Sequence, residues 1–171
     1  THLASSAASD VYKRQLQADL VAFQEMETFE GGDDDSVNLA RTWLLEANPA
    51  YGAAAVGDWR VFPSTQPIFY RKDRFELTDQ GWFFLSDTPD VIYSRTFDGS
   101  YPAFLSWAAF KDRQTGAAFR VANVHLDYSS RENRTKSIAL IADRLAPWID
   151  DGKIVIFAGD LNALAGSSLH D

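Results

Sequence analysis

The segment Ile154–Ala163 constrains the fold of this chain more than any other. Its first five residues are apolar, three of them β-branched, and Gly159 then separates them from Asp160 and Asn162. An apolar run of this kind predicts a buried strand, which would deliver a carboxylate and a carboxamide together at its C-terminal end. Such a pair can hold a water molecule or a metal ion beside a phosphate group, although the same residues also suit an Asx turn.

Composition narrows the function without deciding it. The 171 residues suffice for one domain with a substantial core, and five Trp, six Tyr and twelve Phe favour sheet-rich packing. A net charge of −8 disfavours non-specific binding to duplex nucleic acid, which needs Lys and Arg to displace counterions. A phosphate substrate is still allowed, because a divalent ion inverts the local charge of an acidic site. The chain has no cysteine, which excludes disulfides, thiolate zinc sites and a Cys nucleophile.

The N-terminal segment differs from the rest of the chain. Residues 1–15 show no periodicity, and Asp10–Gln15 resembles the translation of a sequencing-library adapter. We therefore expect residues 1–15 to be non-native or disordered and residues 16–171 to form one domain. No apolar stretch is long enough to span a membrane, and no signal peptide is visible. The localisation is open, with the cytoplasm as the default expectation, because a signal peptide can be missing from a sequence whose N-terminus is not native. We expect the protein to be a monomer.

The first half of the chain predicts a strand, a helix and a pair of strands. Asp19–Glu25 is a short apolar run with Glu25 at its exit, typical of a buried strand. Ser36 can cap a helix that ends at Asn48 and Pro49. The acidic loop before it lacks the ligand pattern of an EF-hand. The remaining expectations are a region over 50–66 that is mostly loop, a turn over 72–74, and strands over 67–71 and 75–77 that pair around this turn.

The second half predicts a hairpin, a helix and the final strand. Strands over 103–111 and 117–125 flank a loop in which Gly116 can adopt positive φ. Ser129 or Ser130 can cap a helix that runs through Leu145. Its expected core face consists of Ile138, Ile141, Leu145 and Trp148. Hairpins outnumber β-α-β units in this order, which favours a mixed-sheet sandwich with outer helices over a doubly wound parallel sheet.

Polar side chains stand where three of the predicted strands end. They are Glu25, the segment Asn123–Asp127 with His125 at its centre, and Asp160 with Asn162. If these strands lie side by side, one sheet edge collects carboxylates, an imidazole and amides. This assembly suits metal-assisted phosphoester hydrolysis, because it offers a hard oxygen ligand for Mg²⁺ or Mn²⁺, a carboxylate for the attacking water and donors for phosphoryl oxygens. A single Glu or His at such a position more often has a structural role. The combination of Glu25, His125 and the other polar residues favours a catalytic site.

Four segments, in this order, resemble successive motifs of the endonuclease/exonuclease/phosphatase superfamily of metal-dependent phosphoesterases. They are Asp19–Glu25, Pro67–Arg71, Asn123–Asp127 and Gly159–Ala163. The resemblance runs from about Leu16 to the end, and it specifies the superfamily but no substrate. It implies an α/β (α+β) fold: a four-layer α/β/β/α sandwich, here incomplete, with the site at one edge of the paired sheets.

The resemblance also implies roles for the matched residues. Glu25 would be the Mg²⁺ (or Mn²⁺) ligand, and Asp160 would position and activate the nucleophilic water. Asn162 would hydrogen-bond the scissile phosphate, and His125 would contact a phosphate oxygen and stabilise charge in the transition state. Weaker candidates for substrate binding are Asn123, Asp127 and Arg134, for which structural roles are equally good explanations.

The chain also departs from the family pattern. The family's first strand, with an Asn near the metal, would fall in residues 1–15, and residues 62–66 contain no acid where many members carry a Glu that orients the motif His. The family's late Asp-His pair has no equivalent, because His170 and Asp171 stand in the wrong order and too close to Asn162.

These departures leave two functional hypotheses. The first is a fragment of a Mg²⁺-dependent phosphoesterase, inactive as given, whose full-length form hydrolyses a small phosphoester or nucleic acid. The alternative is a non-catalytic binding domain or pseudoenzyme of the same fold. The calcineurin-like metallophosphatases are disfavoured, since they need several His ligands and a Gly-Asn-His segment, and this chain has three His and no such segment.

Overall fold

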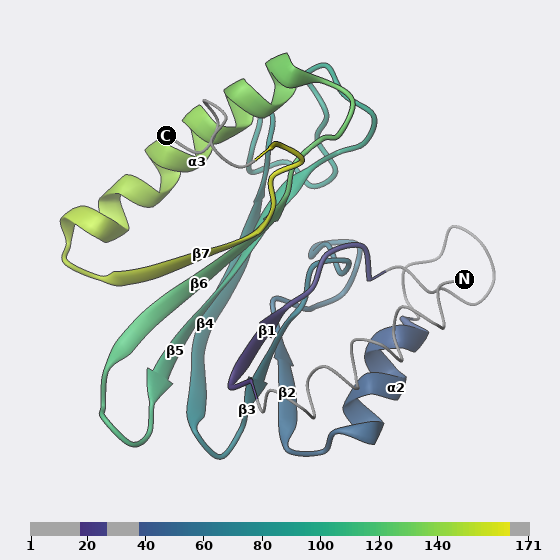
Figure 1. Cartoon of the computed structure of the whole chain (residues 1–171). Helices are drawn as coiled ribbons and strands as arrows, with labels where there is room; N and C mark the ends of the chain where they lie inside the picture. The colour runs from purple at the N-terminus through teal and green to yellow at the C-terminus, as the bar shows by residue number, and fades with distance from the viewer. Residues whose placement is uncertain (1–17, 27–37, 165–171) are drawn as a thin grey trace.

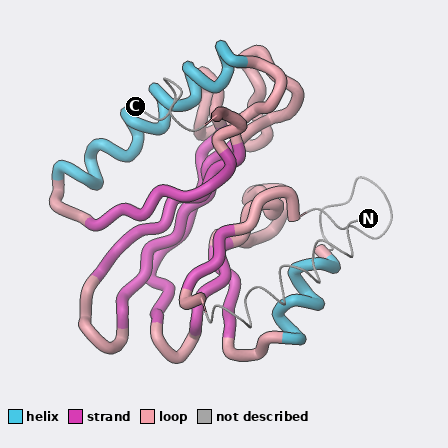
Figure 2. Tube along the Cα trace, in the orientation of Figure 1, coloured by secondary structure: helices cyan, strands magenta, loops and turns pink. Residues whose placement is uncertain are grey.

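The computed structural model of the chain describes residues 18–26 and 38–164. These residues form seven strands and two helices (Figures 1 and 2). In chain order the elements are β1 (Leu20–Ala22), α2 (Leu39–Ala47), β2 (Tyr51–Ala54), β3 (Ile68–Arg71), β4 (Phe75–Phe84), β5 (Phe104–Asp112), β6 (Ala118–His125), α3 (Arg131–Asp150) and β7 (Ile154–Asp160). The predictions for residues 1–15 and for the acidic loop 31–35 lie outside the described residues.

The strands form two sheets that pack face to face. One sheet has the order β1-β3-β2 and is antiparallel throughout. The other has the order β4-β5-β6-β7, in which only β6 and β7 run parallel. Helix α2 covers the outer face of the first sheet and α3 that of the second (Figure 1). The predicted four-layer α/β/β/α arrangement is confirmed.

Three hydrophobic clusters fill the spaces between these layers. Between α3 and its sheet, Ile141 and Leu145 pack on Leu105 and Val124. Between the two sheets, the cluster centres on Ile68, which is fully buried together with residues of β5 and β6. The third cluster joins α2 to the smaller sheet. Burial of apolar area, worth roughly 25 cal/mol per Å², therefore holds all four layers together.

Several local predictions for the second half are confirmed. The hairpin of β5 and β6 turns at Gly116, which has φ of +76°. Ser130 caps α3 by accepting a hydrogen bond from the backbone N–H of Asn133. The helix continues to Asp150, past its expected end at Leu145, although it contains Pro147.

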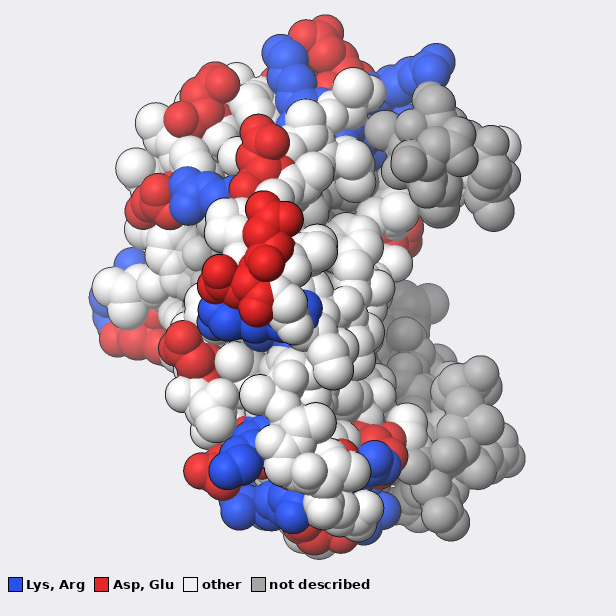
Figure 3. Space-filling model, turned by 90° about the vertical axis from the view of Figure 1, so that its left-hand side faces the viewer, with Lys and Arg blue, Asp and Glu red and all other residues white. Residues whose placement is uncertain are grey.

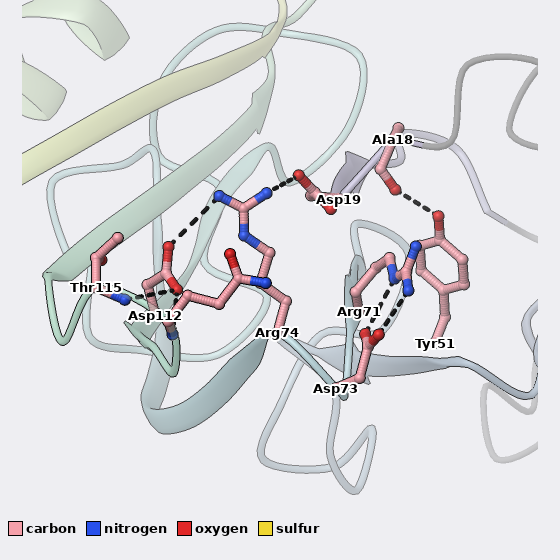
Figure 4. A network of polar contacts seen from close by, with 9 residues as sticks. Ala18, Asp19, Tyr51, Arg71, Asp73, Arg74, Asp112 and Thr115 are labelled. Atoms are coloured by element: carbon pink, nitrogen blue, oxygen red, sulfur yellow. Dashed lines mark hydrogen bonds and ion pairs between the residues drawn. The ribbon is translucent and has the colours of Figure 1, made fainter.

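The predicted pairing of 67–71 with 75–77 is wrong. Residues 72–74 connect the two sheets, since β3 pairs with β1 and β2 while β4 pairs with β5. Arg74 in this connection forms ion pairs with Asp19 before β1 and Asp112 at the end of β5 (Figure 4). Contacts to both sheets replace the cross-strand contacts that a hairpin would have made.

The structure adds detail to two predictions around α2. Residues 50–66 are mostly loop, as predicted, and Tyr51–Ala54 within them forms β2, which pairing with β3 stabilises. The helix is capped by Asn38, whose Oδ1 accepts from the N–H of Arg41 and whose Nδ2 donates to the Met26 carbonyl. The predicted cap, Ser36, lies outside the described residues.

Strand β7 was expected to be buried, and it is instead an exposed edge. The side chains of Ile154, Ile156 and Phe157 are 57%, 44% and 41% exposed. β7 pairs on one side with β6, and within the described residues no strand pairs with its other side. Apolar sequence alone cannot distinguish an edge strand from a central one.

Within the described residues, no helix combines the length and apolarity that crossing a membrane requires.

Asp127 ties the start of α3 to the loop before β5. The residue is fully buried, and its carboxylate accepts hydrogen bonds from Ser100, Ser129 and Ser130 at 2.5 to 2.8 Å. Burial alone would raise the pKa of this carboxyl, but these hydrogen bonds outweigh it and hold the pKa well below its usual value. The carboxylate is therefore an ionised structural anchor.

Replacing this anchor should destabilise the protein. Asp127→Ala leaves buried N–H and O–H donors without an acceptor, and we expect the free energy of unfolding to fall by roughly 3 kcal/mol. Urea denaturation followed by circular dichroism measures this change. The control is Asp73→Ala, which removes a surface carboxylate paired with Arg71 and should change stability little.

The same carboxylate should make stability depend on pH. In the unfolded chain Asp127 takes up a proton near pH 4, whereas the folded protein keeps it ionised to lower pH. Its contribution is fully present above about pH 4 and is lost as the pH falls from there towards the folded pKa. An acid-unfolding profile that is the same in wild type and Asp127→Asn would contradict this role.

Candidate functional site

The predicted site residues meet at one end of the sandwich. In the parallel pair of β6 and β7, His125 is in register with Asp160, and the N–H of Leu126 donates to the Asp160 carbonyl at 2.9 Å. Glu25 follows β1 and therefore comes from the facing sheet. The condition that all three strands lie side by side in one sheet is not met, because β1 belongs to one sheet and β6 and β7 to the other. The site lies at one edge of the paired sheets, as the resemblance implies.

His125 lies between two carboxylates that face its opposite ring nitrogens. Nδ1 is 3.9 Å from Oε1 of Glu25, and Nε2 is 4.0 Å from Oδ2 of Asp160. The imidazole is largely buried, with 12% of its side chain exposed, whereas the Glu25 and Asp160 side chains are 74% and 56% exposed. Both carboxylates are therefore open to water, metal ions or substrate.

The side-chain amide of Asn162 determines which nitrogen of His125 carries the proton. Nδ2 of Asn162 donates to the Leu126 carbonyl at 2.6 Å and lies 3.0 Å from Nε2 of His125. Because a carbonyl only accepts, the Leu126 contact identifies this atom as the nitrogen, which directs its second hydrogen at the imidazole. Nε2 therefore accepts, and neutral His125 carries its proton on Nδ1, the nitrogen nearer Glu25.

The backbone of the site is held in uncommon conformations. Glu25 and Asn162 have φ of +52° and +47°, in the left-handed region that residues other than glycine seldom occupy. Gly159 has φ of +142°, and a Cβ there would lie 1.9 Å from the Val124 carbonyl oxygen. Only glycine fits at this point, and it lets β7 lie close to β6 just before Asp160.

Asn123 joins the two sheets beneath the site. Its fully buried amide donates to the Phe23 carbonyl at 2.8 Å and to the Gln66 carbonyl at 3.3 Å, and it accepts from Nε2 of Gln24 at 2.6 Å. We call Asn123, Gln24 and Gln66 the amide bridge. It fixes the chain immediately before Glu25 to β6, two residues before His125.

The other weaker candidates make contacts within the protein. Asp127 is the buried anchor of α3 described above. Arg134 donates from Nη1 to the carbonyls of Asp127 and Tyr128 at 2.9 and 3.1 Å. A role of these residues in substrate binding stays a prediction, and their present contacts position the loop after β6.

Sequence reasoning missed two residues that shape the site. Tyr101 donates from its hydroxyl to the His125 carbonyl at 2.9 Å, and the two rings lie 5.7 Å apart. Gln24 belongs to the amide bridge, and its sequence signal was a polar residue at the end of an apolar run beside Glu25. Nothing local marked Tyr101, which lies 24 residues before His125.

A cavity of about 350 Å³ opens beside His125. Glu25 and His125 line it, and most of the other described lining residues are aromatic or proline. Asp160 and Asn162 are not among its described lining residues, and both approach Nε2, the ring nitrogen away from Glu25. The order of the three ionisable side chains is therefore Asp160, His125, Glu25, of which the last two line the cavity.

Glu25 offers a ligand of the type that Mg²⁺ prefers. Within residues 18–26 and 38–164, no three His, Asp or Glu residues come together as a metal cluster. Mg²⁺ does not require such a cluster, because it commonly binds one or two carboxylates together with water and substrate phosphate. An exposed carboxylate beside a cavity fits this mode of binding.

Comparison with solved structures identifies proteins of the same architecture. An endonuclease/exonuclease/phosphatase family protein from Bacteroides thetaiotaomicron is 27% identical, with a TM-score of 0.80 over 96% of this chain and 57% of that one. The mannosyl-6-phosphatase Bt3783 of the same organism is 26% identical, with a TM-score of 0.81 over 97% of this chain and 59% of that one. D. rerio TDP2, in complex with single-strand DNA product, shares the fold at 19% identity and a TM-score of 0.68, over 93% of this chain and 54% of that one.

Each of these structures is longer than the present chain, which spans less than two thirds of their length. No family model and no curated protein matches the sequence. The assignment therefore depends on the four ordered motifs, the four-layer fold and the meeting of the motif residues at one end of the sandwich. On these grounds, the chain resembles the endonuclease/exonuclease/phosphatase family proteins in fold and in the order of its motifs.

Proposed function

We propose that this chain carries the core of a metal-dependent phosphoester hydrolase. The observation that supports this most is the placement of His125 between two exposed carboxylates, Asp160 and Glu25, at the mouth of a cavity. The similar structures include a mannosyl-6-phosphatase, which by name acts on a phosphate ester. A phosphoester at the Nδ1 edge of the imidazole would meet the ring N–H as a donor and the Glu25 carboxylate beside it.

Each residue has a distinct task in this proposal. Asp160 accepts a proton from a water molecule, whose oxygen bonds to phosphorus as the ester P–O bond breaks. His125 donates from Nδ1–H to an oxygen of the phosphoryl group and stabilises the charge that develops there. Asn162 holds the imidazole in this tautomer. The products are a free alcohol, which takes up the released proton through solvent, and inorganic phosphate or a phosphomonoester.

Glu25 is the residue that would hold Mg²⁺ or Mn²⁺. The ion would neutralise phosphoryl charge and act as a Lewis acid. The left-handed backbone and the exposed carboxylate of Glu25 keep this ligand directed away from the core. His125 lies close enough to contact a phosphate held at Glu25.

The charge distribution favours small substrates over long duplex nucleic acid. The face of the molecule seen in Figure 3 carries acidic and basic side chains interspersed, with no continuous basic surface. The net charge of the chain is −8. Duplex binding depends on neutralising many phosphates at once, and neither observation supplies the required cations.

Replacing the water-activating carboxylate should abolish most activity. Asp160→Asn, in the protein that carries this chain, removes the proton acceptor but keeps the size of the side chain. We expect kcat to fall by roughly 10²-fold or more, measured as phosphate release. Asp151→Asn is the matched control, because it alters an exposed carboxylate after α3 that pairs with Lys153. Equal activity of both variants would remove Asp160 from the mechanism.

Replacing the metal ligand should change the metal requirement. Glu25→Gln removes the charge and keeps the length of the side chain, so that half-maximal activity should need several-fold more Mg²⁺. A titration of activity against Mg²⁺ measures this, with Glu76→Gln as a control at an exposed residue paired with Arg113. An unchanged Mg²⁺ dependence would show that Glu25 is structural.

The tautomer of His125 can be observed without any turnover. Nitrogen chemical shifts of the imidazole should show the proton on Nδ1 in the wild-type protein at a pH where His125 is neutral. In Asn162→Ala the donor to Nε2 is lost, and the tautomer population should shift towards Nε2–H, the commoner form of free histidine. A wild-type spectrum with the proton on Nε2 would contradict the role given to Asn162.

A further inference from the structure

The cavity beside His125 is lined mainly by rings. Its walls include Tyr93, Tyr101, Phe104 and Tyr128, together with Pro63 and Pro102. At about 350 Å³ it falls within the range of small-molecule sites. Rings at this position contribute flat apolar surfaces with hydroxyl groups at their edges.

Much of this wall is held in place by contacts outside the cavity. Tyr93 donates from its hydroxyl to the Trp59 carbonyl at 2.6 Å, and its ring lies edge-on to Phe84 at 5.6 Å. Phe104 packs on the same Phe84 at 5.4 Å. Tyr101 is fixed through the His125 carbonyl. A preformed wall loses little conformational entropy when a ligand binds.

Tyr128 differs from the other rings because it stands at the rim. It is 68% exposed, more than any other aromatic residue among the exposed large hydrophobics. Its backbone is nevertheless fixed, since Arg134 donates to its carbonyl and the adjacent Asp127 is anchored. A bound ligand could therefore cover an exposed ring without reorganising the loop that carries it.

The described residues that line the cavity offer no cationic side chain to a second phosphate. None of them is Lys or Arg, and Glu25 is the one carboxylate among them. Arg134 lies nearby in sequence, but its Nη1 donates to two backbone carbonyls. A ligand group that enters the cavity beyond His125 is thus best accommodated when it is neutral.

The order of the site places the leaving group in this cavity. Phosphoryl transfer needs the attacking and leaving oxygens roughly in line. Asp160, the proposed water-activating residue, faces Nε2 of His125 and is not among the described residues that line the cavity, whereas Glu25, which faces Nδ1, lines it. The alcohol that leaves therefore departs towards the rings.

We propose that this cavity selects monophosphate esters of neutral, ring-containing alcohols, with the ring against Tyr101 and Tyr128 and the phosphate over His125. The inference rests on the proposed function and adds a substrate class to it. Hexose phosphates and nucleoside monophosphates share this chemistry, while acyclic and multiply phosphorylated compounds do not.

The experiment compares four substrates in the protein that carries this chain, in the presence of Mg²⁺. They are a hexose 6-phosphate, a nucleoside monophosphate, glycerol phosphate and a hexose bisphosphate. Phosphate release gives kcat and KM, and saturation-transfer NMR gives binding independently of turnover. We expect at least one ring monophosphate to exceed glycerol phosphate in kcat/KM by tenfold or more and to exceed the bisphosphate similarly. The first two substrates then distinguish a sugar from a nucleobase as the ring.

Two variants of one residue separate the ring from its hydroxyl. Tyr128→Ala should raise KM for the preferred ring substrate about fivefold or more and leave glycerol phosphate unchanged, because the lost contact is with the ring. Tyr128→Phe keeps the ring and should behave like wild type. Equal kcat/KM for glycerol phosphate and both ring monophosphates would overturn the proposal, as would a Tyr128→Ala variant that is unchanged on the ring substrate.

Failure of the proposed function would look different. Ring monophosphates that bind more tightly than glycerol phosphate, with an NMR response that Tyr128→Ala weakens, would support the cavity assignment even if no phosphate were released. Phosphate release from all four substrates without preference would support hydrolysis and reject the cavity assignment.

Discussion

The site depends on the amide bridge between the two sheets. Glu25 and His125 belong to different sheets, and apolar packing alone would leave their relative position loosely defined, because it has little directional preference. The buried amide of Asn123 supplies the direction, since it donates to the backbone carbonyls of Phe23, just after β1, and Gln66, just before β3. A buried amide is costly unless it is satisfied, so the sheets have one favoured registration. At the other end of the sandwich, Arg74 contacts both sheets (Figure 4).

The sequence predicted correctly those features that a few neighbouring residues determine. The predictions were wrong where the structure depends on a segment that is distant in the chain. The hairpin at Gly116 and the cap at Ser130 follow from turn and capping chemistry within a few residues, and both were correct. Residues 72–74 carry the same kind of turn signal but connect two sheets, which no short segment can reveal. The exposure of β7 was missed for the same reason, since burial depends on neighbours that an apolar run does not specify.

The candidate site was predictable to a similar extent. The motif ends identified Glu25, His125 and Asp160, and the fold brings all three together. Spacing and periodicity did not show which sheet each strand joins, because strand order is a property of the whole chain, and only the resemblance placed the site at an edge of paired sheets. Tyr101 was invisible to motif reasoning, since its contact with His125 depends on how the loop before β5 folds back. The tautomer of His125 likewise required the position of one amide relative to one carbonyl.

The exposed position of β7 affects the fraction of molecules of this chain in which Asp160 and His125 are in place together. Asp160 ends β7 and Asn162 follows it, and β7 pairs on one side with β6, with no strand on its other side among the described residues. Edges of this kind open locally at a lower free-energy cost than the core. Each local opening would separate Asp160 from His125 while both hydrophobic layers around the larger sheet stay intact. Anything that covers this edge would therefore raise the fraction of molecules with an assembled site, without touching a single site residue.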